Sequence, residues 1–293
     1  MEKFLPKILV KLVLPATRDS VLYFGALLFL ATIPSVSAFS PDTWTPGSGW
    51  TLKWSDEFNG TSIDLSNWNY DVGGGGWGNR ELETYTTNAA NSYIQHTTQN
   101  VVDIGELVIT AVKNRAKYTS ARMKTQGKHS WKFGKFAARI RLPYGQGIWP
   151  AFWTLGNDIT TVGWPKCGEI DIMEMIGGGE DRDDSYYGTL HWGDVNGNHA
   201  SVGSGRKELP DPAFLYQDYH VFEIEWSSTE VIWRIDSTEY FRTSITQSDQ
   251  TEFQQEFFII LNLAVGGSWP GNPTGTTVFP QSMYVDWVRV YQH

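Results

Sequence analysis

The sequence predicts an all-β fold in which two antiparallel sheets pack face to face as a sandwich. Short runs of alternating or continuous β-branched and aromatic residues recur along the chain, and turn residues separate them. The sequence contains no heptad repeat and no long stretch with the 3.6-residue period of a helix. Many strands joined by turns are typical of a sandwich, although a barrel would show the same pattern.

Strands are expected where the alternating or continuous apolar pattern is clearest. In the run 220–226, one face carries His220, Phe222, Ile224 and Trp226. Glu223 and Glu225 lie on the other face, as in a half-buried antiparallel strand. Ser227–Glu230 would then form a hairpin turn, and Pro212–Tyr216 is compatible with a short helix. The clearest predicted strands are Leu107–Val112, Phe133–Leu142, Gly147–Leu155, Glu169–Met175, Tyr187–Trp192, His220–Trp226, Val231–Ile235, Phe257–Ala264 and Met283–Tyr291.

Residues 1–38 are predicted to be a secretory signal peptide. Four basic residues precede the apolar run Val21–Ile33, and small residues then lead to a cleavage site after Ala38. The run is shorter than the roughly 20 residues that cross a bilayer. Because the basic region is long, an uncleaved signal-anchor is the alternative. Residues 39–293 are expected to form one catalytic domain, secreted to the extracellular space as a monomer.

The charge balance of the chain is acidic. The formal net charge is −9, and without residues 1–38 the chain would carry 19 basic and 30 acidic side chains, a net charge of −11. This balance argues against nucleic acid and, after signal removal, against an anionic membrane as partners. A neutral polymer needs no charge match. The 14 tryptophans offer flat apolar faces that could stack on sugar rings, although at least half of them should serve the core.

Cys167 is the only cysteine, so an intrachain disulfide is excluded. It adjoins a strongly acidic segment, which makes a nucleophilic thiol an alternative to consider. No obvious partner base lies near it in the sequence, and this argues against thiol catalysis.

Three carboxylates lie within six residues: Glu169, Asp171 and Glu174. Residues two apart in a regular strand point to the same face, so Glu169 and Asp171 share a face. The odd separation of Glu174 from Glu169 would point it away. One extra residue, a β-bulge at or near Met173, would return Glu174 to that face. The parity of the segment therefore predicts a bulged strand.

Neighbouring carboxylates cannot all ionise at low cost, so at least one should keep its proton near neutral pH. A protonated acid beside an ionised one is what glycosidic bond cleavage requires. The alternative is a solvated acidic strand edge. The apolar neighbours Ile170, Ile172 and Met175 favour an internal strand instead. The sequence does not choose between retaining and inverting chemistry.

Gly168–Glu174 resembles the signature of glycoside hydrolase family 16 in its bulged form, which is typical of laminarinase-like endo-1,3-β-glucanases. The resemblance continues in family order over roughly residues 50–292. The matching segments are Trp54–Phe58, Gly75–Leu82, Gly147–Trp153, Thr189–Trp192, Leu261–Gly267 and Val285–Tyr291.

The resemblance implies a jelly roll of two curved antiparallel sheets with a substrate cleft on the concave face. It implies a retaining double displacement in which Glu169 is the nucleophile and Glu174 is the general acid and then the base. Asp171 would lie between them and tune their protonation. The implied substrate-binding residues are Asn79, Arg80, Trp149, Trp153, Trp164, His191, Asn262 and Trp269.

No cofactor is expected for catalysis, because the sequence lacks metal-ligand clusters of Cys and His. The resemblance implies a structural calcium site at Glu57, Gly105 and Asp286, largely through backbone oxygens.

The expected function is hydrolysis of 1,3-β-glucan by a secreted, endo-acting enzyme whose partner is the β-glucan polysaccharide. Mixed-linkage 1,3-1,4-β-glucanase, galactanase and transglycosylase activities are the alternatives within the enzymes. A non-catalytic β-glucan-binding protein is the alternative outside them, and the presence of both Glu169 and Glu174 argues against it.

Overall fold

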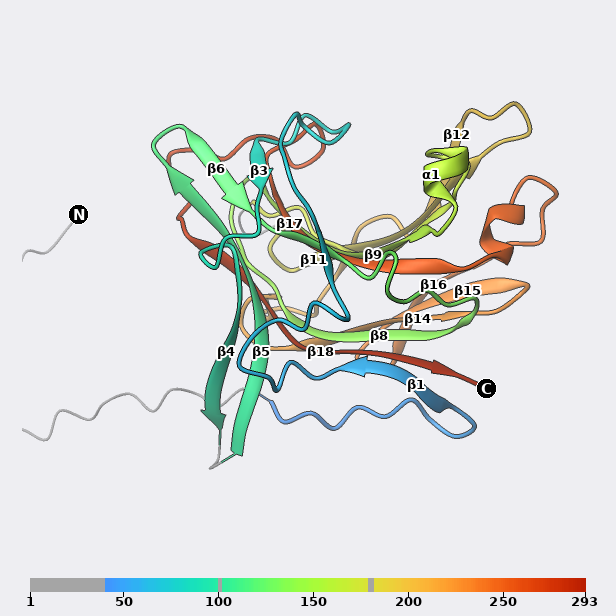
Figure 1. Cartoon of the computed structure of the whole chain (residues 1–293), viewed down its shortest axis with the longest axis horizontal. Coiled ribbons are helices and arrows are strands. Elements are labelled where there is room, and N and C mark those ends of the chain that lie inside the picture. The colour runs from blue at the N-terminus through green and yellow to red at the C-terminus, as the bar shows by residue number, and fades with distance from the viewer. Residues whose placement is uncertain (1–39, 100–101, 179–181) are drawn as a thin grey trace, which may run out of the picture. The chain divides into compact units, whose positions relative to one another are not determined.

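A computed structural model describes residues 40–99, 102–178 and 182–293, which belong to one compact unit. The predicted signal peptide, residues 1–38, lies outside the described residues. Two stacked antiparallel sheets make up the unit, as predicted, and Figure 1 shows one above the other. Within the described ranges, no helix is long and apolar enough to cross a membrane.

The lower sheet in Figure 1, here called the back sheet, has ten strands. Its neighbours pair antiparallel except for β3 and β6, which run parallel. In spatial order it contains β16 (Thr238–Ser244), β15 (Glu230–Ile235), β14 (His220–Trp226), β8 (Gly134–Arg141), β18 (Gln281–Gln292), β5 (Val102–Asn114), β6 (Lys117–Ser120) and β3 (Glu83–Tyr85), with β1 (Thr51–Asp56) on β18 and β4 (Ser92–Gln99) on β5.

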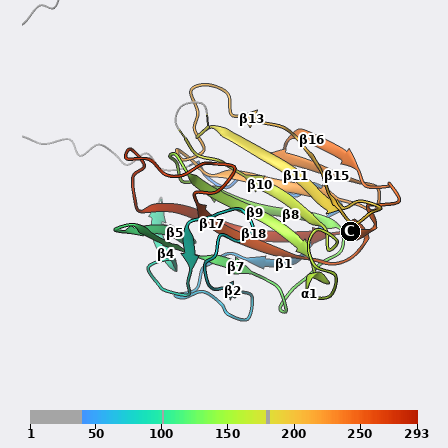
Figure 2. The same ribbon diagram turned by 90° about the horizontal axis from the view of Figure 1, so that it is seen from above.

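The second sheet, here called the front sheet, has eight strands, and Figure 2 shows β11, β10, β9 and β17 running side by side. In spatial order it contains β12 (His199–Gly203), β11 (Ser185–Gly193), β10 (Glu169–Glu174), β9 (Ile148–Gly156), β17 (Phe257–Val265), β7 (Arg122–Lys124) and β2 (Asn69–Asp71), with β13 (Lys207–Glu208) on β11. The short helices are α1 (Ile159–Val162) and the 3₁₀ turn η1 (Thr251–Gln254).

The main hydrophobic core lies between the sheets. Phe136 and Ile224 enter it from the back sheet, and Phe152, Ile170 and Ile172 enter it from the front sheet, all without exposed surface. Full burial of such a side chain contributes about 1.5–3 kcal/mol to stability. Packing against the back sheet therefore fixes the inward side of β10 and leaves its other side for chemistry.

Each of the nine predicted strands coincides with a strand of the structure, and the hairpin turn after β14 is present, with the Ser227 N–H donating to the Glu230 carbonyl. The predicted helix at Pro212–Tyr216 is wrong. That segment forms turns, in which the Ala213 N–H donates to the Pro210 carbonyl. The strands that the sequence did not predict are mostly short or polar, so few residues can display an alternation.

The expectation that one face of β14 is exposed is wrong at Glu223. Its side chain is only 2% exposed, because the lead-in segment 40–50 crosses the outer face of the back sheet and covers it. Trp44 packs against Trp287 with ring centroids 5.3 Å apart and donates its indole N–H to Glu223 Oε2. Lys135 Nζ lies 3.5 Å from the same carboxylate and balances its charge. The lead-in therefore closes the back face of the sandwich.

Trp44→Ala is expected to lower the free energy of unfolding by about 3 kcal/mol, at the low end of the range for burying a large aromatic residue. The substitution removes the packing on Trp287 and leaves the Glu223 carboxylate one donor short. Urea denaturation of both proteins measures the difference. Thr43→Ala, on the exposed side of the same segment, is the matched control and should change little. A loss below about 0.5 kcal/mol for the tryptophan variant would contradict this role.

Candidate active site

The acidic strand β10 is bulged, as its parity predicts. Its pairing with β9 is regular from Glu169 opposite Leu155 to Asp171 opposite Trp153, and the register then shifts so that Glu174 lies opposite Ala151. The register with β11 shifts over the same residues. The extra residue lies within residues 172–173. Glu169, Asp171 and Glu174 consequently share one face, opposite the core.

Two side chains of the back sheet support the bulge from beneath. The Trp233 indole N–H donates to the Asp171 carbonyl at 2.8 Å, and the Tyr240 hydroxyl donates to the Ile172 carbonyl at 3.3 Å. Gly188 lies on β11 beside the bulge, and a Cβ there would come within 2.5 Å of the Trp233 ring. A larger residue than glycine would therefore block the support that these two side chains give.

The three carboxylates form one interacting group with His191. His191 Nε2 lies 3.1 Å from Asp171 Oδ2. One side-chain oxygen or nitrogen from each of Glu169, Asp171 and His191 lies within 4.8 Å of the other two. Asp171 is buried, whereas Glu169 and Glu174 are half-buried and reach the solvent side of the strand. Each glutamate accepts one indole N–H: Trp164 donates to Glu169 at 2.8 Å and Trp149 to Glu174 at 3.0 Å.

Burial raises the pKa of each of the three acids. The pKa of Glu169 rises to about 8, first through burial and then through the Asp171 charge, while His191 and the Trp164 hydrogen bond oppose the rise. The pKa of Asp171 also rises through burial, and the hydrogen bond with Glu169 opposes this. The pKa of Glu174 also rises, because burial acts together with the charges of Asp171 and Glu169, while His191 and the Trp149 hydrogen bond oppose the rise. The surroundings of Glu174 therefore favour its protonated form.

The acids lie on the floor of a cleft with a cavity volume of about 560 Å³, within the usual range of ligand sites. Figure 1 shows α1 and β12 above one end of the front sheet and β3 and β6 above the other. The lining is rich in aromatic and polar groups. It comprises Trp77, Gly78, Asn79, Glu81, Arg122, Trp149, Ala151, Trp153, Leu155, Ile159, Trp164, Glu169, Asp171, Glu174, Thr189, His191, His199, Asn262, Ala264 and Trp269.

The four tryptophans proposed from sequence all line the cleft. Trp164 and Trp269 are the most exposed, at 50% and 40%, and so have free ring surface for a ligand. Trp149 packs edge-on against Trp269. Trp153 instead has the Arg122 guanidinium 4.6 Å from its ring centroid, so one of its faces is already covered.

Asn79 and Asn262 also line the cleft, and each is held by a hydrogen bond: Asn79 donates to Glu81 at 3.0 Å, and Asn262 accepts the Trp153 indole N–H at 2.7 Å. Arg80 does not join them. Its side chain is exposed and does not belong to the lining of the cleft, and its backbone has a positive φ of 62°. The expectation that Arg80 contacts substrate is not supported by this arrangement.

Arg122 and His199 are cleft residues that the sequence did not reveal. Arg122 lies between the Trp77 and Trp153 rings and lowers the pKa of Glu169. His199 stacks on His191, with its Nε2 2.7 Å from His191 Nδ1. Both lie on short strands, β7 and β12, which carry too few residues for a pattern. Thr189 could have been found by parity, since it shares a face with His191.

Cys167 is not suited to nucleophilic chemistry. It is buried in a small cluster with Leu155, Phe258 and Ile260. Burial, together with the nearby charges of Glu169 and Asp158, raises the pKa of its thiol to about 12. The reactive thiolate is therefore scarce near neutral pH.

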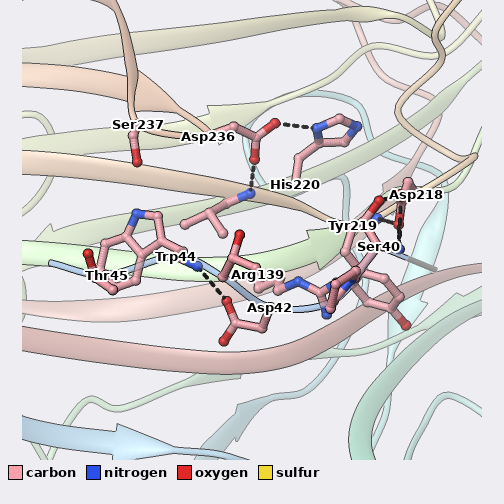
Figure 3. A pocket seen from close by; sticks show the side chains of 13 residues that line it. Ser40, Asp42, Trp44, Thr45, Arg139, Asp218, Tyr219, His220, Asp236 and Ser237 are labelled. Atoms are coloured by element: carbon pink, nitrogen blue, oxygen red, sulfur yellow. Dashed lines mark hydrogen bonds and ion pairs between the residues drawn. The ribbon is translucent and has the colours of Figure 1, made fainter. Parts of the chain in front are cut away.

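A second cavity, of about 370 Å³, lies where the lead-in segment meets the back sheet (Figure 3). Its polar groups already bond one another. Asp218 accepts the Ser40 N–H, and Asp236 accepts the Val221 N–H at 2.8 Å while its other oxygen lies 2.7 Å from His220 Nδ1. These bonds fasten the lead-in to the back sheet, and the described residues that line the cavity include no cluster of carboxylates like that of the cleft, so the cleft is the candidate active site.

The expected calcium residues lie near one another, because β1 pairs with β18, and a Cβ on Gly105 would come within 2.1 Å of the carbonyl oxygen of Phe58, the residue after Glu57. Both carboxylates contact arginine instead: Glu57 pairs with Arg289 at 2.8 Å and Asp286 with Arg139 at 2.5 Å. Side-chain ligation is therefore not favoured. Backbone oxygens remain the expected ligands, and calcium binding stays a prediction.

The chain is similar to known proteins over most of its length. The family model for glycosyl hydrolases family 16 matches residues 86–289. The β-glucanase of Rhodothermus marinus is 38% identical over 278 residues, which are 90% of this chain and 92% of that protein. The clotting factor G alpha subunit of Tachypleus tridentatus is 39% identical over 251 residues, which are 83% of this chain and 34% of that subunit. The chain thus spans about a third of the latter relative.

The fold of the chain is also similar to that of a solved structure. The catalytic domain of an endo-1,3-β-glucanase (laminarinase) from Thermotoga petrophila RKU-1 has 43% sequence identity and a TM-score of 0.71, over 83% of this chain and 98% of that one. The family model spans most of the chain. The β-glucanase relative and the laminarinase fold both point to the same family. The chain therefore belongs to glycosyl hydrolase family 16 and is a jelly-roll glycoside hydrolase.

Proposed function

We propose that the chain is a secreted, endo-acting hydrolase of 1,3-β-glucan that retains the configuration of the anomeric carbon. One observation carries the proposal: the bulge aligns Glu169, Asp171 and Glu174 on the floor of a tryptophan-rich cleft. The substrate is supported by the name of the Thermotoga laminarinase and by the bulged form of the acidic strand.

In the first step, the Glu169 carboxylate attacks the anomeric carbon and Glu174 gives its proton to the departing glycosidic oxygen. The surroundings of the two glutamates are compatible with these roles. The charges of both other acids raise the pKa of Glu174 and favour its protonated form, whereas Arg122 is a further positive charge that favours ionised Glu169. His191 and an indole hydrogen bond oppose the rise in pKa at both glutamates. Asp171, in contact with His191, raises the pKa of both glutamates through its charge.

In the second step, water replaces the leaving group and Glu174, now ionised, removes its proton while the bond to Glu169 breaks. Glu174 can take up a proton again because its pKa lies well above the usual range of glutamate. The Trp149 indole N–H holds Glu174 Oε1 in both steps. A sugar acceptor in place of water would give transglycosylation at the same intermediate.

A non-catalytic glucan-binding role is the second candidate, and the raised pKa values argue against it. Binding alone gains nothing from three mutually repelling acids at a buried or half-buried strand, since these acids cost stability when they ionise. We also propose that the enzyme acts as a monomer and needs no cofactor for catalysis, with any calcium ion confined to the structural position at Glu57, Gly105 and Asp286.

Glu169→Gln and Glu174→Gln should each abolish most laminarin hydrolysis, with kcat lower by at least roughly 10²–10⁴-fold. An aryl β-glucoside oligomer with an acidic phenol as leaving group separates the two roles. It should restore the first step in Glu174→Gln, because a good leaving group needs no proton, and should not restore it in Glu169→Gln. The release of the phenol measures the difference.

Glu208→Gln is the matched control, since Glu208 lies on β13 outside the cleft with an exposed side chain. It should keep full activity. Equal phenol release by both active-site variants would show that the roles are assigned wrongly. Binding of laminarin by the wild type without release of reducing sugar would overturn the enzyme proposal itself.

Product analysis on laminarin, barley glucan, lichenan and agarose tests the substrate. We expect laminarin to be cleaved with the highest kcat/KM and its products to be internal oligosaccharides of mixed length. Predominant cleavage of barley glucan or lichenan would indicate a mixed-linkage enzyme. Predominant cleavage of agarose would place the enzyme among galactanases.

Secretion is tested by N-terminal sequencing of the protein recovered from the culture medium of a host that produces the full chain. We expect the mature protein to begin at Phe39, after cleavage at Ala38. An intact Met1 on a membrane-bound product would indicate the uncleaved signal-anchor instead.

A further inference from the structure

A hydrogen-bonded chain of side chains runs along one wall of the cleft, beside the three acids. Glu81 accepts the Asn79 side-chain N–H at one oxygen and the Tyr85 hydroxyl at the other, at 3.0 and 3.1 Å. The Tyr85 oxygen accepts from Asn262 at 3.1 Å, and Asn262 accepts the Trp153 indole N–H. Three of the sugar-binding residues expected from the sequence, Asn79, Asn262 and Trp153, are thus oriented through Glu81.

Glu83 lies behind this chain and is not itself in the cleft. Its side chain is 1% exposed. One carboxyl oxygen accepts the Val265 N–H at 2.7 Å, and the other oxygen, Oε1, is buried and has no hydrogen-bond partner among the described residues. Val265 ends β17, and its carbonyl also accepts the Leu82 N–H. Glu83 therefore joins the loop that carries Asn79 and Glu81 to the end of β17.

We propose that Glu83 is a positioning residue that holds the sugar-binding wall in place only while it carries a proton, so that the enzyme loses substrate affinity when Glu83 ionises. The inference rests on the proposed function, since it concerns the affinity for glucan. When Glu83 is protonated, its carbonyl oxygen can accept the Val265 N–H and its hydroxyl can point toward Glu81. An ionised carboxyl would set two negative charges side by side in a buried place.

The groups around Glu83 favour its protonated form. Burial and the charge of Glu81 raise the pKa of Glu83 to about 8. Tyr85 follows on β3 as a neutral phenol, and Arg122 on β7 acts on Tyr85 but is already paired with Asp71 at 3.0 Å. The neighbouring β17, Phe257–Val265, has no ionisable side chain. On β6, which pairs with β3, the residue opposite Glu83 is Tyr118. Neither β7 nor β17 therefore supplies a free positive charge that would offset an ionised Glu83.

Ionisation of Glu83 should therefore change KM for the glucan without changing kcat. Repulsion from ionised Glu83 displaces Glu81, and with it the hydrogen bonds that orient Asn79 and Asn262. Loss of one such hydrogen bond to a sugar hydroxyl raises KM by roughly fivefold. The catalytic acids and their direct partners are not part of this chain of hydrogen bonds, so kcat should follow its own pH dependence.

Glu83→Gln tests the proposal, because the amide mimics the protonated carboxyl and does not titrate. KM and kcat for laminarin are measured from pH 6 to 9.5 for both proteins. We expect equal KM values at pH 6, a KM roughly fivefold higher in the wild type at pH 9.5, and kcat profiles that coincide. Coinciding KM profiles would overturn the proposal, as would a variant that fails to fold.

Glu106→Gln is the matched control. Glu106 is another buried glutamate with a raised pKa, but it lies on β5 of the back sheet and bonds Tyr219, not the cleft wall. Its substitution should leave the pH dependence of KM as in the wild type. An equal effect of both variants on KM would show that any buried carboxylate of the fold acts in this way, and would also overturn the proposal.

Thermal unfolding provides a measurement that does not depend on activity. Glu83 ionises near its ordinary pKa of 4.5 in the unfolded chain and near 8 in the folded protein. Below pH 4.5, Glu83 is protonated in both the folded and the unfolded state. Between pH 4.5 and 8 it keeps its proton only in the folded state. The free energy of unfolding of the wild type therefore falls relative to that of Glu83→Gln as the pH rises from 4.5 to 8. The difference should then level off.

The two proposals fail in distinguishable ways. A wild type that does not cleave laminarin at pH 6 refutes the proposed substrate, while the unfolding curves still report whether Glu83 is protonated in the fold. A wild type that cleaves laminarin with the same KM profile as Glu83→Gln refutes the role of Glu83 alone.

Discussion

The hydrogen bond from the Trp233 indole to the Asp171 carbonyl is the contact on which the active site depends. A regular β10 would direct Glu174 into the core, where an acid has no partner. The bulge redirects it, and the carbonyls that the bulge takes out of the ladder need donors from elsewhere. Trp233 and Tyr240 supply them from the back sheet, and Gly188 leaves the room they need.

The electrostatics of the cleft follow from that geometry. Acids gathered on one face of a buried strand raise one another's pKa values, and the groups around each acid then shift its pKa further. Indole N–H groups orient both glutamates without adding charge, and His191 opposes the rise in pKa at both. Arg122 is a further positive charge that acts on Glu169. Any difference in role between the two chemically identical side chains would therefore arise from such neighbours.

The sequence predicted much of this structure, because its long strands and their parity are local properties. The bulge followed from counting residues between Glu169 and Glu174. The burial of Glu223 did not, since the lead-in that covers it is distant in sequence, and neither did that of Glu83, whose partner Val265 lies on a distant strand. Arg122, His199 and the exposed position of Arg80 depend on short strands and a left-handed turn, which leave no periodic trace.

The support of β10 by the back sheet also bears on how the enzyme acquires activity during folding. A front sheet that had formed its own ladders but not yet docked would lack Trp233 and Tyr240, and its acids would remain in water with ordinary proton affinities. Catalytic competence therefore cannot precede the docking of the sheets. A partly unfolded enzyme that keeps most of its strands would be inactive, and activity should vanish with the cooperative loss of the core.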